Sequence, residues 1–431
     1  MLPAERSSVV LATVWLFFLL LGYFMIRPVR ETLGSVAGTK QLQGLFLASF
    51  LMMLAVVPAY GALVKWLPRR WLVRVVYHFF AACLLGFWAL LRVDSEVVQS
   101  WTAWALFVWI SVFGLFATSV FWSVLADLFS SDQGKRLFGL VASGGTAGAI
   151  VGSLLTSQLA DNLTTGQLVL LPIVVIEAGL WCAWRLEKQA SKLKTADPLP
   201  IESKTPEDKP TGGGLWSGIT HILKSPYLAM ICLFLFFVQA CGTQLYFEQA
   251  EIVNAKVVGE EDKTALFAYL DLGTQLLTLF AQLFLSGFIL RRLGTSVALV
   301  ILPLVYLISF SALALSPSLG VLVVVVILGR ATGYGITVPA REVLFTVVSR
   351  EDKYKSKNFI DTVVLRGGDA LSGQIFGALR GMNLGLRGLN LCFIPVVAVW
   401  ALVAWRLGRR QEKLARASSA MPVPSEPDGH H

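Results

Sequence analysis

Charged side chains stand inside or at the ends of long apolar stretches of this 431-residue sequence, and they are the candidates for its chemistry. Arg-Pro-Val-Arg-Glu at 27–31 and Val-Pro-Ala-Arg-Glu at 338–342 both place an arginine and a glutamate just after a proline. Arginine offers a planar fork of donors that matches the oxygens of a phosphate or carboxylate. We therefore expect an anionic, phosphorylated substrate to be bound by Arg27, Arg30, Arg330 and Arg341.

A second charged group is a candidate for coupling or gating. Asp361, Arg366 and Asp369 are spaced at five and three, so Arg366 and Asp369 share one helix face and Asp361 lies on the same side two turns away. Two interpretations stay open: an internally neutralised cluster that fixes helix geometry, or a switch in which substrate or a proton competes for the pairs. Glu31 and Glu342, each next to an arginine, are assigned to the same coupling or gating role.

The composition defines the elements that hold these charges. With 55% hydrophobic and 15% charged residues and a mean hydropathy of +0.68, the chain is too apolar for soluble domains. Its apolar residues come in blocks of about 20, long enough to cross a hydrocarbon core of about 30 Å as helices. Continuous apolar blocks exclude a membrane β-barrel, whose strands alternate polar and apolar residues. The expected fold class is an all-α polytopic membrane protein.

Twelve spans are predicted, in two sets of six. They cover residues 8–26, 42–64, 72–91, 101–123, 138–160 and 167–184, then 226–247, 264–286, 295–315, 319–340, 358–379 and 389–405. The predicted units are an N-terminal six-helix bundle (1–184), a cytoplasmic linker with an interfacial helix (185–225), a C-terminal six-helix bundle (226–405) and a disordered cytoplasmic tail (406–431).

The formal charge of +9 indicates how the chain is oriented across the membrane. Most of the 36 Lys and Arg residues fall in the two termini, the even-numbered loops and the linker, which places these segments in the cytoplasm. We expect a multi-pass protein of the cell inner membrane with both termini cytoplasmic. Because topology explains the basic loops, no nucleic-acid partner is implied.

The two halves share short motifs. Gly144-Gly-Thr-Ala in span 5 corresponds to Gly367-Gly-Asp-Ala in span 11, and basic loops follow spans 2 and 8 at a similar offset. Two copies of six spans are the layout of the major facilitator architecture, in which two halves rock around a central cavity. Small residues at Gly144, Gly148 and Gly152, and at Gly373 and Gly377, are expected to pack across the interface between halves; ordinary tight packing is the alternative.

Charges within the spans are costly, at roughly 2.5 to 3.5 kcal/mol each at the bilayer centre, so each one is a site hypothesis. In the assumed architecture, the spans that contain them line the cavity, including span 8 with Asp271 and span 10 with Arg330. Near the membrane midplane, Arg330 needs a paired anion or a solvated cavity. Glu177 in span 6 has no explanation from the sequence.

Several motifs resemble those of the ATP/ADP translocase family, the nucleotide transporters of plastids and obligate intracellular bacteria, together with their free-living bacterial relatives. They are Tyr23-Phe-Met-Ile-Arg-Pro-Val-Arg-Glu-Thr-Leu33, Phe121-Trp-Ser-Val-Leu-Ala-Asp-Leu-Phe129, Lys135-Arg-Leu-Phe-Gly139, Pro339-Ala-Arg-Glu and Lys355-Ser-Lys-Asn-Phe-Ile-Asp-Thr-Val-Val364. The resemblance extends over nearly all twelve spans. Arg366-Gly-Gly-Asp369 is typical of the free-living branch.

The resemblance implies roles for individual residues in nucleotide exchange. Basic positions of the family fall on Arg30 and Arg341, beside Glu31 and Glu342. The acidic position of span 4 falls on Asp127 and that of span 7 on Glu248, with Gln244 as the alternative register. This sequence departs from the family by having Arg in place of Lys twice and Asp in place of Glu.

The resulting expectation is a monomeric secondary transporter that exchanges a nucleotide or related organic phosphate by alternating access, without a cofactor or metal. A second reading keeps the fold and predicts proton-coupled movement of another small solute, with Asp127, Asp361 or Asp369 as the proton carrier. A membrane enzyme or receptor is disfavoured, because the sequence has no nucleophile motif and no His-rich cluster.

Overall fold

The computed structural model describes residues 3–66, 69–129, 131–196, 225–348 and 360–419. All of its elements are helical. The first half comprises α1 (Pro3–Ala37), α2 (Thr39–Trp66), α3 (Arg69–Leu91), α4 (Glu96–Leu128), α5 (Ser131–Leu159) and α6 (Thr165–Ala196). The second comprises α8 (Pro226–Lys256), α9 (Glu260–Phe280), α10 (Gly294–Leu315), α11 (Leu319–Thr332), α12 (Val338–Leu344), α14 (Leu365–Gly381) and α15 (Leu386–Ser419).

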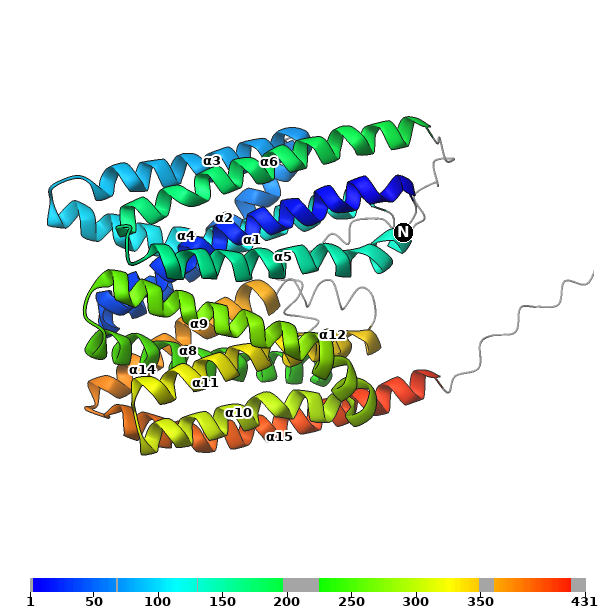
Figure 1. Ribbon diagram of the computed structural model, residues 1–431. Coiled ribbons are helices and arrows are strands. Elements are labelled where there is room, and N and C mark those ends of the chain that lie inside the picture. Colours follow the sequence, from blue (N-terminus) through cyan, green and yellow to red (C-terminus); the bar gives the residue numbers. More distant parts are fainter. Residues whose placement is uncertain (1–2, 67–68, 130, 197–224, 349–359, 420–431) are drawn as a thin grey trace, which may run out of the picture.

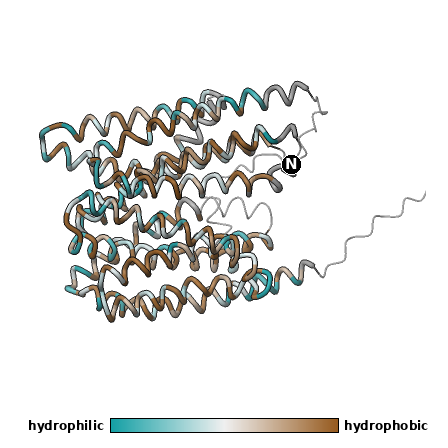
Figure 2. The backbone as a smooth tube through the Cα atoms, in the orientation of Figure 1, coloured by the Kyte–Doolittle hydropathy of each residue, from teal (hydrophilic) through white to brown (hydrophobic). Residues whose placement is uncertain are grey.

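Figure 1 shows the helices lying roughly side by side in two bundles, with α1 to α6 in one and α8 to α15 in the other. Eleven of the described helical segments are long and apolar enough to cross a membrane. The twelfth helix is α14 with the π-helical turn before it, Ile360–Val364, which carries Arg366 and Asp369. Hydrophobic residues dominate along the helices in Figure 2. The predicted fold class, twelve membrane helices in two halves, is confirmed.

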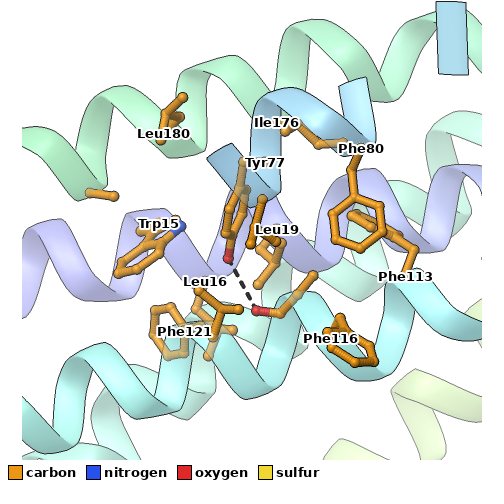
Figure 3. Packing of buried hydrophobic residues seen from close by; sticks show 14 of the residues in the cluster. Trp15, Leu16, Leu19, Tyr77, Phe80, Phe113, Phe116, Phe121, Ile176 and Leu180 are labelled. Atoms are coloured by element: carbon orange, nitrogen blue, oxygen red, sulfur yellow. Dashed lines mark hydrogen bonds between the residues drawn. The ribbon is translucent and has the colours of Figure 1, made fainter. Parts of the chain in front are cut away.

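Aromatic packing holds the first half together. In Figure 3, side chains of α1, α3, α4 and α6 interlock around Trp15, whose ring lies 4.8 Å from that of Phe121, centroid to centroid. Edge-on aromatic contacts of this kind add to the area that the rings bury. The Tyr77 hydroxyl donates to the carbonyl oxygen of Ala117 at 3.1 Å, which satisfies a polar group deep in the bundle.

The helices continue past several predicted ends. The first span was expected to end at 26, but α1 continues through Pro28 to Ala37, so its charged residues lie inside the bundle and do not close the helix. Helix α6 likewise continues to Ala196, beyond the predicted boundary at 184. The predicted interfacial helix at 215–223 lies outside the described residues.

The predicted disordered tail is wrong for residues 406–419, because α15 continues to Ser419. The reason is a contact with the start of α10. Glu412 Oε1 accepts hydrogen bonds from the backbone nitrogen and the hydroxyl of Ser296, both at 2.9 Å. Gly408 allows this approach, because a Cβ there would lie 2.7 Å from the backbone nitrogen of Ser296.

The glycine face of α5 does not pack across the halves, so that prediction is wrong. Gly144, Gly148 and Gly152 face α1 of the same half, and a Cβ at Gly152 would lie 2.6 Å from the carbonyl oxygen of Leu21. Small residues allow two membrane helices to approach closely enough for such backbone contact. The prediction holds for Gly377 of α14, where a Cβ would collide with Gln43 of α2 in the other half.

The two halves meet at the end of the bundle that lies opposite the chain termini (Figure 1). Hydrogen bonds join Thr32 to Thr264 at 2.8 Å and Gln374 to the carbonyl oxygen of Gln43 at 3.4 Å. An apolar cluster that includes Phe107 of one half adds to this contact; its other buried members are Leu42, Leu45, Phe247, Ala250, Phe376 and Leu389. This end of the helix bundle is therefore closed.

Glu177 finds its partner within the first half. Its Oε1 lies 3.2 Å from Nδ1 of His78 on α3, and both side chains are about half exposed on the outer surface. A polar pair of this kind joins two membrane helices where lipid offers no alternative partner. Glu177 therefore belongs to the contact between α3 and α6.

The contact between α1 and α5 yields a test. Gly148→Ala would place a methyl group against the carbonyl oxygen of Phe17, so we expect the free energy of unfolding to fall by about 1–3 kcal/mol. The measurement is the thermal unfolding midpoint in detergent. Gly86→Ala is the control, because a Cβ there meets nothing within 4 Å. Equal midpoints for the two variants would contradict the packing described.

Candidate functional site

One carboxylate joins two arginines at the centre of the molecule. Asp271 Oδ1 on α9 lies 3.2 Å from Nη1 of Arg27 on α1 and 3.3 Å from Nη1 of Arg330 on α11. The second guanidinium nitrogen of Arg330 donates to Gln249 Oε1 at 3.1 Å. Because α1 belongs to the first half and α9 and α11 to the second, the cluster connects the two halves.

Local irregularities in the helices lie beside these arginines. Pro28 is inside α1, where it removes one backbone donor between Arg27 and Arg30. A π-helical turn, Gly333–Thr337, interrupts the span that holds Arg330. Such turns are frequent at functional sites, and a helix interior tolerates proline in a membrane where neighbouring helices surround the backbone.

Arg30 has a different environment from the other two arginines. Its guanidinium carbon lies 4.7 Å from the ring centre of Phe107 and 5.9 Å from that of Tyr246. Its nearest described carboxylate is that of Glu31, at 3.8 Å, which lies at the same distance from Arg27. Aromatic faces attract a cation without neutralising it, so Arg30 keeps its positive charge available for an anion.

These groups line a cavity of about 250 Å³ between the halves. Its lining carries three arginines, Arg27, Arg30 and Arg330, and two carboxylates, Glu31 and Asp369, which leaves one positive formal charge. Asp271 lies outside the lining, where it contacts Arg27 and Arg330, while Arg366 pairs with Asp369, so adding these two leaves the balance unchanged. The remaining lining is uncharged and partly aromatic: Phe46, Val238, Gln239, Gly242, Thr243, Tyr246, Leu302, Tyr306, Gly329, Gly333 and Tyr334. The site can therefore attract an anion and pack a flat apolar group beside it.

Asp369 forms a second polar centre in the same wall. Its Oδ1 accepts from Gln239 Nε2 at 2.8 Å and from Thr243 Oγ1 at 3.1 Å, while Oδ2 lies 3.6 Å from Nη1 of Arg366. A small cavity of about 30 Å³ lies between Arg30, Arg366 and Asp369. The predicted pair on one face of this helix is present, and the structure adds its two neutral donors.

Other predicted residues lie outside this cavity. Glu248 is buried in α8 with no exposed surface, and its Oε1 accepts from Asn390 Nδ2 of α15 at 2.8 Å. Arg341 of α12 contacts the adjacent Glu342 at 3.3 Å and does not line the cavity. The side chains of Asp127 and Asp361 lie outside the described part of the structure.

The sequence analysis did not select several residues that line or complete the site. Asp271 was noted as a charge in span 8 but not chosen, although its apolar surroundings were a usable signal. Gln249, Gln239 and Thr243 are neutral, so charge could not reveal them. Only the packing of α8 against α11 and α14 shows that they contact charged groups.

Comparisons with known proteins identify relatives of this chain and structures with a similar fold. ADP,ATP carrier protein 1 of Chlamydia muridarum is 22% identical over 391 residues, which cover 80% of this chain and 72% of that protein. The crystal structure of a bacterial homolog of the human lysosomal transporter Spinster, inward-facing and unoccupied, has a TM-score of 0.58 at 15% identity. The matched region covers 95% of this chain and 99% of the Spinster homolog.

A bacterial homologue of the iron transporter ferroportin, in an inward-facing state, has a TM-score of 0.61 at 12% identity over 96% of this chain and 100% of that one. The resemblance to ADP,ATP carriers extends across both halves at low identity, which supports the relationship predicted from the motifs. The family model of the Major Facilitator Superfamily matches residues 8–356, which is most of the chain. The protein therefore belongs to the Major Facilitator Superfamily and is a secondary transporter, not an enzyme.

Proposed function

We propose that the protein exchanges a nucleotide or a related anionic organic phosphate across the cell inner membrane by alternating access. The observation that carries this proposal is the convergence of Arg27 and Arg330, from opposite halves, on one anionic oxygen. A phosphate group offers several oxygens to such a pair of donor forks. A substrate bound there contacts both halves, which is what alternating access requires.

The dimensions and lining of the cavity favour a small phosphorylated compound or the phosphoryl end of a larger one. Its volume of about 250 Å³ is just below the roughly 300–1,000 Å³ of sites that enclose drug-sized ligands. Tyr246, Tyr306 and Tyr334 provide aromatic surface beside the arginines. The similarity to ADP,ATP carriers supports a nucleotide within this class.

The arginine near the end of the interrupted span has a separate proposed role. Arg341 lies eleven residues beyond Arg330, about 16 Å along a helix, toward the end that carries the termini. We expect it to contact the anion on its path to the cavity. We also propose that both termini of the chain lie in the cytoplasm.

The proposal predicts the behaviour of Arg30. Arg30→Gln removes a charged donor from the cavity, and we expect nucleotide affinity to fall about 10- to 100-fold, because hydrogen bonds to charged groups are worth about 1.5–3 kcal/mol. Counterflow of labelled ADP and ATP into liposomes measures the effect. Arg387→Gln, at an exposed position of α15, is the matched control. Unchanged affinity in Arg30→Gln would refute the assignment.

The buried glutamate of α8 provides a second test. Glu248→Gln keeps an oxygen that can accept from Asn390, so we expect it to fold and transport like the parent protein. Glu248→Ala leaves the buried amide of Asn390 without that partner and should lower the free energy of unfolding by about 1–3 kcal/mol. Thermal unfolding and counterflow are measured together. Loss of transport in a normally folded Glu248→Gln would show that the charge itself is required.

A second candidate function is proton-coupled transport of another small solute. The observation that favours it is Asp369, a carboxylate in the cavity wall held by neutral donors on one oxygen and by Arg366 on the other. In that case Asp369→Asn should abolish uptake driven by an imposed pH gradient and preserve counterflow without one. If the uptake rate of the parent protein is the same with and without the pH gradient, proton coupling is excluded.

A further inference from the structure

The contact between Asp271 and the two arginines has the form of an occupied anion site. The side chain has no exposed surface, and a single oxygen, Oδ1, lies within 3.3 Å of guanidinium nitrogens from both halves. This is the arrangement that an oxygen of a bound phosphate would adopt. The carboxylate therefore contacts the two arginines as an oxygen of a substrate anion would.

The other oxygen of Asp271 shows that the contact is incomplete. Oδ2 is buried and has no hydrogen-bond partner among the described residues. A buried carboxylate with unsatisfied acceptor capacity is less stable than one whose oxygens are all paired. An anion that offers more oxygens to Arg27 and Arg330 can therefore compete with Asp271 for them.

The same contact links the two halves of the protein. Arg27 belongs to α1, and the hydrogen bond between Thr32 and Thr264, also on α1 and α9, lies beside it at the closed end. Opening that end separates α1 from α9 and breaks the ion pair between Arg27 and Asp271, which leaves Arg27 with Glu31 at 3.8 Å and Asp271 with Arg330 alone. Separating a buried ion pair is strongly unfavourable, so the contact between Arg27 and Asp271 opposes reorientation.

We propose that Asp271 is a built-in competitor of the substrate anion, and that it restricts this transporter to exchange. When no anion is bound, Asp271 holds Arg27 and Arg330 and keeps the two halves together; we call this contact of three side chains the lock. A bound anion takes over both arginines, the lock is released, and the site can face the other side. This inference rests on the proposed function for the nature of the anion, but the lock itself is a property of these side chains.

Asp271→Asn tests the lock through transport. In liposomes loaded with labelled ADP, the parent protein should release label only when unlabelled nucleotide is present outside. The variant should raise the ratio of release without external nucleotide to release by exchange at least tenfold. Asp262→Asn, an exposed carboxylate on the same helix, is the matched control and should leave this ratio unchanged. An unchanged ratio in Asp271→Asn would overturn the proposal.

A second measurement requires no substrate. Cysteines placed at Gln43 and Gln374, which contact each other across the closed end, can be joined by a short bifunctional thiol reagent in a background without the native cysteines. We expect efficient cross-linking in the parent protein and at least threefold slower cross-linking with Asp271→Asn. Arg27→Gln breaks the same link while Asp271 keeps Arg330, so it should show the same effect if Asp271→Asn folds poorly.

The two measurements separate the two proposals. If the parent protein exchanges no nucleotide or organic phosphate, the proposed function fails, yet slower cross-linking in Asp271→Asn and Arg27→Gln still supports the lock. If the parent protein exchanges nucleotide and both variants cross-link at the parent's rate, the lock fails and the proposed function stands. Faster cross-linking in either variant would also overturn the inference.

Discussion

The enclosure of three arginine side chains, one buried and two partly buried, between two apolar bundles is the constraint on which the rest of this structure depends. A guanidinium group in a membrane interior is stable only beside an anion, a polar partner or a solvated cavity. Asp271 and Gln249 supply partners for Arg330, Glu31 and Asp271 supply them for Arg27, and aromatic rings surround Arg30. Each of these partners lies on a particular helix, so the pairing of the charges limits how the two bundles can pack against each other.

The helices accommodate this constraint through departures from regular geometry. Pro28 lies between Arg27 and Arg30. Beyond Arg330, α11 ends at Thr332 and the π-helical turn Gly333–Thr337 follows directly. Both leave backbone groups less tightly bonded than in a continuous α-helix. They occur next to the cavity, where neighbouring polar groups and space are available, and the outer helices of the bundle provide the rigid frame around them.

Closure at one end and polarity at the centre are linked through α1. The helix carries Arg27, Arg30 and Glu31 at the cavity, then Thr32 one residue later at the contact with α9. A movement that separates α1 from α9 therefore changes the charge pairing and the closed end together. Close packing of α1 on the glycine face of α5 couples these two helices, because backbone contacts of this kind resist sliding.

The sequence alone predicted the class of fold, the number of membrane helices and the charged residues that line the cavity, although Asp271 was noted and not selected. Apolar blocks of membrane length and the cost of intramembrane charge are properties of the chain itself, which is why Arg27, Arg30, Arg330, Arg366 and Asp369 could be identified from it.

Only the tertiary structure decided which charges meet. Arg27 and Asp271 are 244 positions apart, and the sequence gives no distance between separate helices. The same limitation explains the errors: the glycine face of α5 was assigned to the wrong partner, and Glu412 was left in a disordered tail although it binds Ser296. Periodicity shows which face of a helix is small or polar, whereas the helix that covers that face depends on how all twelve pack together.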